Sequence, residues 1–194
     1  LMRPARLRDG REVIEFLRDA ALREVIEGDA LAMLEGVLGV ADIQVRDIMV
    51  PRSQMTVINR DDDGEALLAT VVESGHSRFP VMDEDREKIV GILLAKDLLR
   101  LQLATEDAPF DIKEFMRTPV FVPESKRLNV LLREMRRSRV HMAIVADEYG
   151  GIAGLVTIED IIEQIVGEID DEHDIDEDVN IRKDVENQYI VRGQ

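Results

Sequence analysis

The chain has 194 residues, of which 25 are basic and 41 acidic, and its formal net charge is −16. This length allows one domain or two small ones, and a hydrophobic share of 45% is enough for a sizeable core. The acidic balance argues against nucleic acid as a partner, because phosphates require a basic surface. The absence of Cys excludes disulfides, thiolate metal sites and cysteine nucleophiles. No apolar run approaches the roughly 20 residues that span a bilayer.

Two helices are predicted ahead of residue 45. Apolar residues recur at helical spacing over residues 11–26, and again over residues 31–38. The pair Gly28-Asp29 predicts a break between these two stretches. We expect two short helices that pack on the part of the chain that follows, after a basic lead-in at residues 1–10.

From residue 45 onward the sequence repeats itself. VRDIMVPR at 45–52 is answered by IKEFMRTP at 112–119, with an offset of 67 residues. VGILLAKDLL at 90–99 is answered by AGLVTIEDII at 153–162, with an offset of 63. Matches in the same order with a slowly changing offset indicate two copies of one structural unit.

Each copy is predicted to run strand–helix–strand–strand–helix, an α/β (α+β) unit. Asp62 or Asp63 is expected to cap the first helix of the first copy, and Ser125 the matching helix of the second. The strands are expected at 55–58, 79–82 and 89–93 in the first copy and at 120–122, 143–145 and 152–156 in the second. One such unit is too small to bury both faces of its sheet, so the copies should pack on each other.

The stretch GLVTIED at 154–160 predicts a strand-to-helix junction, with a short apolar strand followed by a helix that begins near Ile158. This junction says most about function. The Thr157 hydroxyl would lie beside the unpaired N–H groups of the helix start, a favourable place for a phosphate. Asp160 offers two acceptor oxygens to the paired hydroxyls of a ribose. Both residues also suit a plain helix cap, so this pattern alone leaves two interpretations open.

The segment 168–178 contains eight carboxylates in eleven residues. An EF-hand starting at Asp170 would need Gly at its sixth position and Glu at its twelfth, but Ile175 and Ile181 occupy them. Two interpretations remain, a solvated acidic linker and a weak Mg²⁺ site. The candidate ligands of that site are Asp170, Asp171, Glu172 and Asp174.

Several longer motifs resemble one known family. The twin units, the second ending in G-L-V-T-I-E-D, resemble a tandem pair of CBS domains, which are modules that bind adenine nucleotides. RDIMVPRSQM at 46–55, HSRFPV at 76–81 and HMAIVADEYGG at 141–151 are similar to the CorC/HlyC group of magnesium and cobalt efflux proteins, relatives of the CNNM transporters. The resemblance implies an N-terminal helical segment at 1–44, CBS domains at 45–108 and 109–170, and an acidic linker with the start of a transporter-associated domain at 171–194.

The resemblance also implies a ligand, AMP or ATP with Mg²⁺ on its phosphates, in the cleft between the copies. Thr157 and Arg78 would contact phosphate, and Asp160 the ribose hydroxyls. The other implied nucleotide-binding positions are Met55, Thr56 and Val57 at the adenine, Phe79 and Pro80 as an apolar wall, and Ile158. In the first copy Leu94 replaces the hydroxyl while Asp97 remains, so the second site is expected to be degenerate.

We therefore expect a regulatory module rather than an enzyme, since no catalytic motif is present. From the resemblance we expect a homodimer that works with a membrane ion transporter, in the cytoplasm or peripheral to the inner membrane. One alternative is a dimerisation and docking scaffold with a vestigial nucleotide site. Another is a direct sensor of divalent metal that uses the acidic run.

Overall fold

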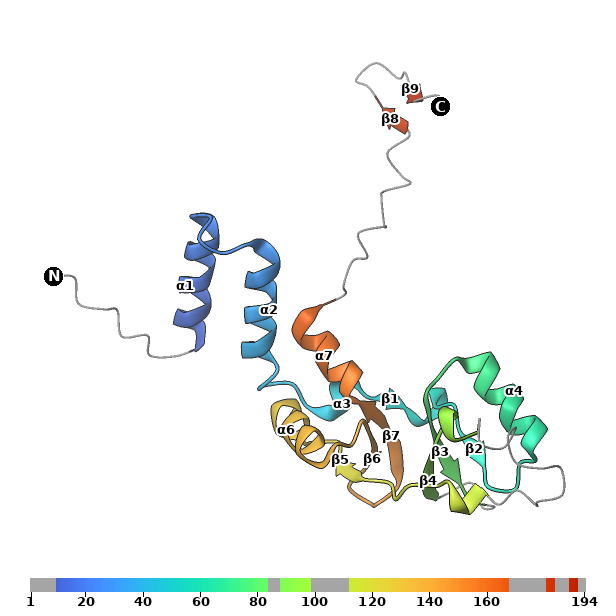
Figure 1. The fold of residues 1–194 in the computed structure, drawn as a ribbon. Helices are drawn as coiled ribbons and strands as arrows, with labels where there is room; N and C mark the ends of the chain where they lie inside the picture. The colour runs from blue at the N-terminus through green and yellow to red at the C-terminus, as the bar shows by residue number, and fades with distance from the viewer. Residues whose placement is uncertain (1–9, 84–87, 99–111, 168–180, 184–188, 192–194) are drawn as a thin grey trace.

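The computed structural model describes residues 10–83, 88–98, 112–167, 181–183 and 189–191 (Figure 1). The chain opens with two helices, α1 (Gly10–Leu22) and α2 (Gly28–Gly39), as the periodicity predicts. The expected break at Gly28-Asp29 is wrong, because Gly28 is already the first residue of α2. The chain turns over residues 23–27, where Glu24 has a left-handed φ of 57°.

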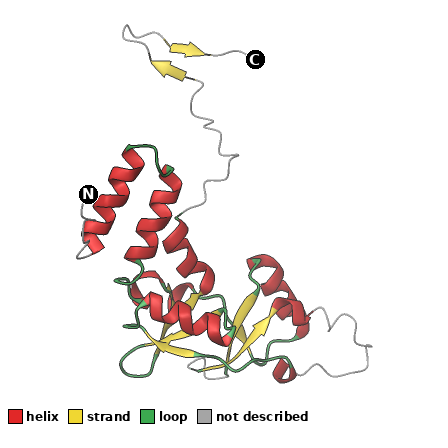
Figure 2. Cartoon of the chain, turned by 60° about the vertical axis from the view of Figure 1, so that its left-hand side comes forward, coloured by secondary structure: helices red, strands yellow, loops and turns green. Residues whose placement is uncertain are grey.

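The helical pair is anchored through α2 to the last helix of the second copy, α7 (Ile158–Val166). A Cβ on Gly36 would overlap the backbone carbonyl of Ile165, so only glycine permits this close approach. Arg18 on α1 donates a hydrogen bond of 2.7 Å to Glu35 on α2, which raises the pKa of the Arg18 guanidinium. Figures 1 and 2 both show α1, α2 and α7 side by side.

The two copies fold alike, which confirms the repeat. In the first copy β2 (Ile58–Asn59) pairs in parallel with β3 (Arg78–Met82), which pairs antiparallel with β4 (Ile89–Leu94). In the second copy β5 (Phe121–Pro123), β6 (Met142–Ala146) and β7 (Ile152–Thr157) pair in the same way. The helix between the first two strands is α4 (Gly64–Ser74) or α6 (Leu128–Ser138), and a helical stretch at 95–98 matches the start of α7. Each antiparallel pair even shifts register at the same place, at Val81/Met82 and at Val145/Ala146.

The segment ahead of each copy crosses to the sheet of the other copy. After α3 (Val45–Ile48), strand β1 (Val50–Pro51) pairs antiparallel with β7, placing Val50 opposite Leu155. After the 3-10 turn η2 (Ile112–Glu114), Arg117 and Ile92 exchange backbone hydrogen bonds of 2.9 Å. Arg117 is the repeat counterpart of Val50, and Ile92 that of Leu155. Each copy therefore receives the same kind of strand contact from the segment that precedes the other copy.

Three apolar clusters hold the fold together. One lies in the second copy, around Leu128 and Ile161, and one in the first, around Leu67 and Phe79. The third cluster joins the copies, because it combines residues of β3 and β4 with residues of β6 and β7. Its buried members are Met82, Ile89, Ile92, Met142, Ile144 and Leu155. The expectation that the copies pack on each other is therefore confirmed.

Two local predictions are wrong. The strand expected at 55–58 is mostly absent, because residues 55–57, which follow the 3-10 turn η1 (Arg52–Gln54), form no regular structure and only Ile58 of the expected segment pairs. Ser125 does not cap α6, because the helix starts at Leu128 and its N-cap residue is Arg127, whose side chain makes no capping hydrogen bond to the helix. Asp63 caps α4 as expected, accepting from the Ala66 N–H at 2.8 Å.

Near the end of the chain β8 (Ile181–Lys183) pairs antiparallel with β9 (Tyr189–Val191). Within the described residues, no helix is both long and apolar enough to cross a membrane. The acidic candidates Asp170, Asp171, Glu172 and Asp174 lie outside the described residues.

Candidate functional site

A cleft of about 370 Å³ lies between the two copies, a size within the usual range of small-molecule sites. Both copies contribute to its wall, which is partly apolar and partly polar. The residues that line it are Val50, Gln54, Met55, Thr56, Gly75, His76, Ser77, Arg78, Met142, Leu155, Thr157, Glu159 and Asp160.

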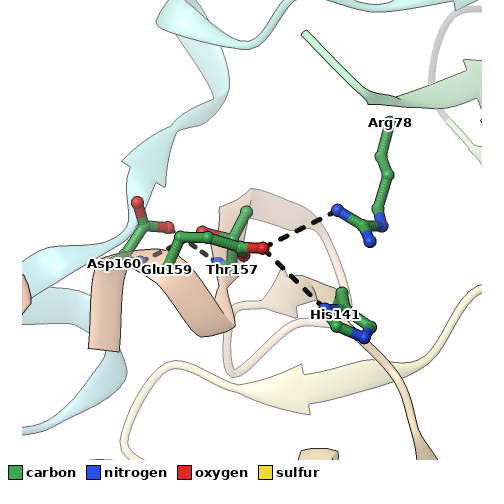
Figure 3. Close-up of polar contacts among 5 residues, drawn as sticks. All are labelled: Arg78, His141, Thr157, Glu159 and Asp160. Carbon is green, nitrogen blue, oxygen red and sulfur yellow. Dashed lines mark hydrogen bonds and ion pairs between the residues drawn. The ribbon is translucent and has the colours of Figure 1, made fainter. Parts of the chain in front are cut away.

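Thr157 and Asp160 lie together at one side of this cleft, where β7 ends and α7 begins (Figure 3). The Thr157 N–H donates to Asp160 Oδ2 at 2.7 Å, and the Asp160 N–H donates to Thr157 Oγ1 at 3.1 Å. This reciprocal capping box fixes both side chains at the cleft. The Thr157 hydroxyl proton and the Oδ1 oxygen of Asp160 are not used by the box, so each residue keeps bonding capacity for a ligand.

Arg78 faces the helix start from the first copy. Its Nη1 lies 3.8 Å from Glu159 Oε1, and the same oxygen lies 3.8 Å from His141 Nδ1. Figure 3 shows the Arg78 and His141 side chains converging on this carboxylate. The side chains are 27%, 47% and 60% exposed for Arg78, His141 and Glu159. Pairs this long and this exposed contribute little to stability, so an anionic ligand could readily displace Glu159 from Arg78.

The structure brings five of the expected nucleotide positions together in the cleft, namely Met55, Thr56, Arg78, Thr157 and Asp160. Four others are placed elsewhere. Phe79 is fully buried in the core of the first copy, and Pro80 beside it is also buried. Val57 packs against the cluster between the copies, and Ile158 against the core of the second copy. The apolar wall expected from Phe79 and Pro80 is formed instead by Val50, Met55, Met142 and Leu155.

Sequence reasoning missed several lining residues. Val50 reaches the cleft because β1 crosses to the sheet of the second copy, a pairing that no local sequence pattern predicts. Met142 on β6 and Leu155 on β7 line the cleft from the second copy itself. Glu159 stands between Thr157 and Asp160 in the sequence and could have been found by following the first turn of the helix. Ser77 could have been found in the same way, because it stands next to Arg78, just before a strand.

The other candidate positions lie apart from this cleft. Asp97, the counterpart of Asp160, pairs with Arg117 Nη2 at 3.3 Å and is not part of the cleft lining. Over the described ranges, no group of three or more His, Asp or Glu side chains is arranged to hold a metal ion. The acidic run 168–178 falls outside those ranges.

The sequence matches two family models and curated relatives. The family model described as the CBS domain matches residues 45–104 and 112–167, more than half of the chain. A second model, described as the N-terminal region of NMB0537, matches residues 6–40. The chain is 49% identical to the magnesium and cobalt efflux protein CorC of Vibrio cholerae over 186 residues, which cover 96% of the chain and 64% of that relative. It thus spans less than two thirds of the length of this curated relative.

Solved structures agree with the sequence matches. The CBS domain of a bacterial CNNM/CorC family Mg²⁺ transporter in complex with ATP is 46% identical, with a TM-score of 0.63, and the match covers 71% of the chain and 96% of that structure. The chain belongs to the CorC/CNNM family. A CBS-domain pair with bound AMP from Klebsiella pneumoniae is 34% identical, with a TM-score of 0.56, covering 64% of the chain and 99% of that structure. The CorC/CNNM chain therefore contains a tandem CBS pair, as its repeat predicts.

Proposed function

We propose that the chain is the regulatory module of a magnesium and cobalt efflux protein and that it binds an adenine nucleotide, AMP or Mg-ATP, in the cleft between its two CBS units. The observation that carries this proposal is the convergence of Thr157 and Asp160 from one copy with Arg78 from the other. The ATP and AMP complexes of the related CBS structures support the choice of ligand. The proposed domains are the N-terminal helical segment at 1–44, the CBS domains at 45–108 and 109–170, and the acidic linker with the start of a transporter-associated domain at 171–194.

The lining suggests how each part of the nucleotide is held. The apolar side chains of Val50, Met55 and Leu155 offer the base a surface on which to pack. Asp160 Oδ1 accepts from the ribose hydroxyls, and Arg78 with the Thr157 hydroxyl binds phosphate. Because the wall comes from both copies, a bound nucleotide stabilises one relative arrangement of the copies over another, and regulation follows from that difference.

Glu159 gives a reason for Mg²⁺ to accompany ATP. Its carboxylate lies 3.8 Å from Arg78 Nη1, so phosphates that reach Arg78 also approach a negative charge. A divalent cation on the phosphates reduces this repulsion. The bound state would be passed to a membrane ion transporter through a homodimer of the pairs, in the cytoplasm or at the inner membrane.

Isothermal titration calorimetry of the intact chain with AMP and with ATP, each with and without Mg²⁺, tests the proposal. Micromolar binding of either nucleotide is the expected result. The capping box gives Thr157 and Asp160 a structural role that needs no ligand, which is the observation that favours a docking scaffold with a vestigial site. Absence of heat with every nucleotide would support that scaffold, and heat with Mg²⁺ alone would point to a direct metal sensor.

Glu159→Gln is expected to tighten ATP binding in the absence of Mg²⁺ by about fivefold, because it removes one partly screened negative charge near the phosphates. The same change should leave the affinity for Mg-ATP almost unaltered. Titrations at two Mg²⁺ concentrations check both statements. Weaker ATP binding by this variant without Mg²⁺ would show that Glu159 does not oppose the phosphates.

A further inference from the structure

An open groove of about 470 Å³ lies along α6 and shares no lining residue with the cleft between the copies. The residues that line this α6 groove are Asn129, Leu132, Arg133, Arg136 and Arg137. These positions recur every three or four residues, so they form one face of the helix. The three arginines are exposed, and the buried residues of α6 are not among those that line the groove.

The α6 groove concentrates positive charge in a chain whose net charge is −16. Arg133 lies three residues before Arg136 and four before Arg137, so the like charges repel one another along the helix. None of the three forms an ion pair with another described residue, and no carboxylate in the described ranges lines the groove. A negatively charged partner would remove this repulsion and offer charge-assisted hydrogen bonds to the guanidinium groups.

Asn129 indicates which kind of anion fits the groove. Its Oδ1 oxygen is buried and accepts no hydrogen bond from any described residue. A buried acceptor without a partner costs free energy, so a partner that brings a hydrogen-bond donor is favoured. A stretch of acidic polypeptide supplies carboxylates for the arginines and backbone N–H groups for Asn129, whereas a simple inorganic anion offers mainly acceptors.

The helices α6 and α7 lie next to each other and run in opposite directions (Figure 1). The N–H of Ile158, the first residue of α7, donates a hydrogen bond of 3.0 Å to the carbonyl of His141, three residues after the end of α6. The start of α7 therefore lies beside the end of α6.

The end of α7 lies on the side where α6 begins, because both are close to the end of α2. Ile165 of α7 contacts Gly36 in the last turn of α2. The N–H of Leu128, the first residue of α6, donates to the carbonyl of Ile43, four residues after α2 ends. Gly167, which caps α7, thus lies toward the end of the α6 groove that contains Asn129.

The acidic run 168–178 follows Gly167 directly and carries eight carboxylates in eleven residues, outside the residues that the structure describes. Eleven extended residues reach up to about 35 Å, whereas the groove between Asn129 and Arg137 spans only about 12 Å along the helix. The run is therefore long enough to follow the whole groove. Because it is tethered at Gly167, its effective concentration is on the order of millimolar, so several individually weak ion pairs suffice to hold it.

We propose that the acidic run 168–178 docks in the α6 groove of the same chain, with its carboxylates on Arg133, Arg136 and Arg137. Docking holds the chain that follows residue 178 against the second copy instead of leaving it on a solvated linker. It also assigns the acidic run to a contact within the protein rather than to a Mg²⁺ site. The inference does not rest on the proposed nucleotide function, because the groove and the cleft have no lining residue in common.

A distance measurement between two spin labels tests the proposal on the intact chain. The chain has no Cys, so His173→Cys in the acidic run and Ser138→Cys at the end of α6, outside the groove lining, give two unique attachment sites. We expect a narrow distribution of label distances in double electron–electron resonance at an ionic strength of about 0.01 M. The distribution should become broad in about 1 M KCl, where the screening length falls to about 3 Å.

Two outcomes with the labelled chain would overturn the proposal. One is a broad distribution at low ionic strength, which would show that the acidic run does not dock. The other is a change in the distribution when the labelled chain is diluted with an excess of unlabelled chain. That change would place the run on a second copy rather than on its own α6.

Arg133→Glu with Arg137→Glu, introduced into the labelled chain, should abolish the narrow distribution at low ionic strength. Both positions are exposed and glutamate is a good helix former, so the variant should fold, which its thermal transition checks. The matched control is Lys88→Glu with Lys96→Glu, which changes the net charge by the same amount at exposed positions of the first copy. The control should keep the narrow distribution.

Reversing the charge of the run should restore docking to the variant with glutamate at positions 133 and 137. Asp170→Lys with Asp174→Lys supplies two cations for the two new carboxylates, and the narrow distribution should return. Its failure to return would contradict direct pairing between the run and the groove. A narrow distribution that survives Arg133→Glu with Arg137→Glu would also overturn the proposal, as would an equal loss in the lysine control.

Discussion

Replacing Asp160 with alanine is expected to lower the affinity for AMP roughly 10- to 100-fold, because charge-assisted hydrogen bonds to the ribose are lost. Asp160 lines the cleft, and its Oδ1 oxygen is not used by the capping box with Thr157. The variant should also unfold at a slightly lower temperature, since the N-terminal end of α7 loses one hydrogen bond. Calorimetric titration with AMP and a thermal melt separate these two effects.

Asp47→Ala is the matched control for this change. Asp47 accepts a hydrogen bond of 2.8 Å from the Gln44 N–H at the start of α3, the same bond that Asp160 makes to Thr157. Asp47 does not line the cleft. The control should therefore show the modest stability loss without any loss of AMP binding. Equal affinity of the unaltered chain and Asp160→Ala for AMP would remove Asp160 from the site.

Replacing Gly154 with alanine is expected to destabilise the fold by about 2 kcal/mol or more, because overpacked cores rarely absorb a new atom without backbone movement. A Cβ at this position would overlap the backbone carbonyl of Val50, so β1 would have to move away from β7. A fall in the melting temperature of about 4–8 °C is expected for a chain of this size. Because β1 carries Val50 to the cleft, nucleotide binding should weaken as well.

Two other glycines give graded controls for the Gly154 variant. At the corresponding position of the first copy, the nearest atoms to a Cβ on Gly91 belong to the side chain of Met116, which can shift more easily than a backbone carbonyl. Gly91→Ala should therefore cost less than Gly154→Ala. At Gly39, near the end of α2, a Cβ would meet nothing within 4 Å, so Gly39→Ala should be neutral or slightly stabilising. A melting temperature for Gly154→Ala equal to that of Gly39→Ala would show that β1 does not need this contact.

The elements that local pattern governs could be predicted from the sequence. The strands β3, β4, β6 and β7 were expected within one residue of their observed ends, because apolar runs between turn formers specify them. The sequence also offered Thr157 as a cap of α7, since a helix cap depends on residues only three positions apart. The start of α6 could not be predicted in this way, because the residues ahead of the helix make backbone hydrogen bonds with a distant segment, from Val45 N–H to Lys126 O and from Leu128 N–H to Ile43 O.

The sequence by itself determined that this protein is a twofold repeat of a small α/β unit, with Thr157 and Asp160 at a strand-to-helix junction. These features depend on neighbouring residues and on self-similarity, which are visible in one dimension. Only the tertiary structure decided which side chains line the cleft between the two copies. The crossing of β1 to the sheet of the second copy places Val50 opposite Leu155 at the cleft, whereas Phe79 is buried in the core of the first copy. Such pairings join residues about a hundred positions apart, and the burial they produce depends on the whole fold rather than on any local pattern.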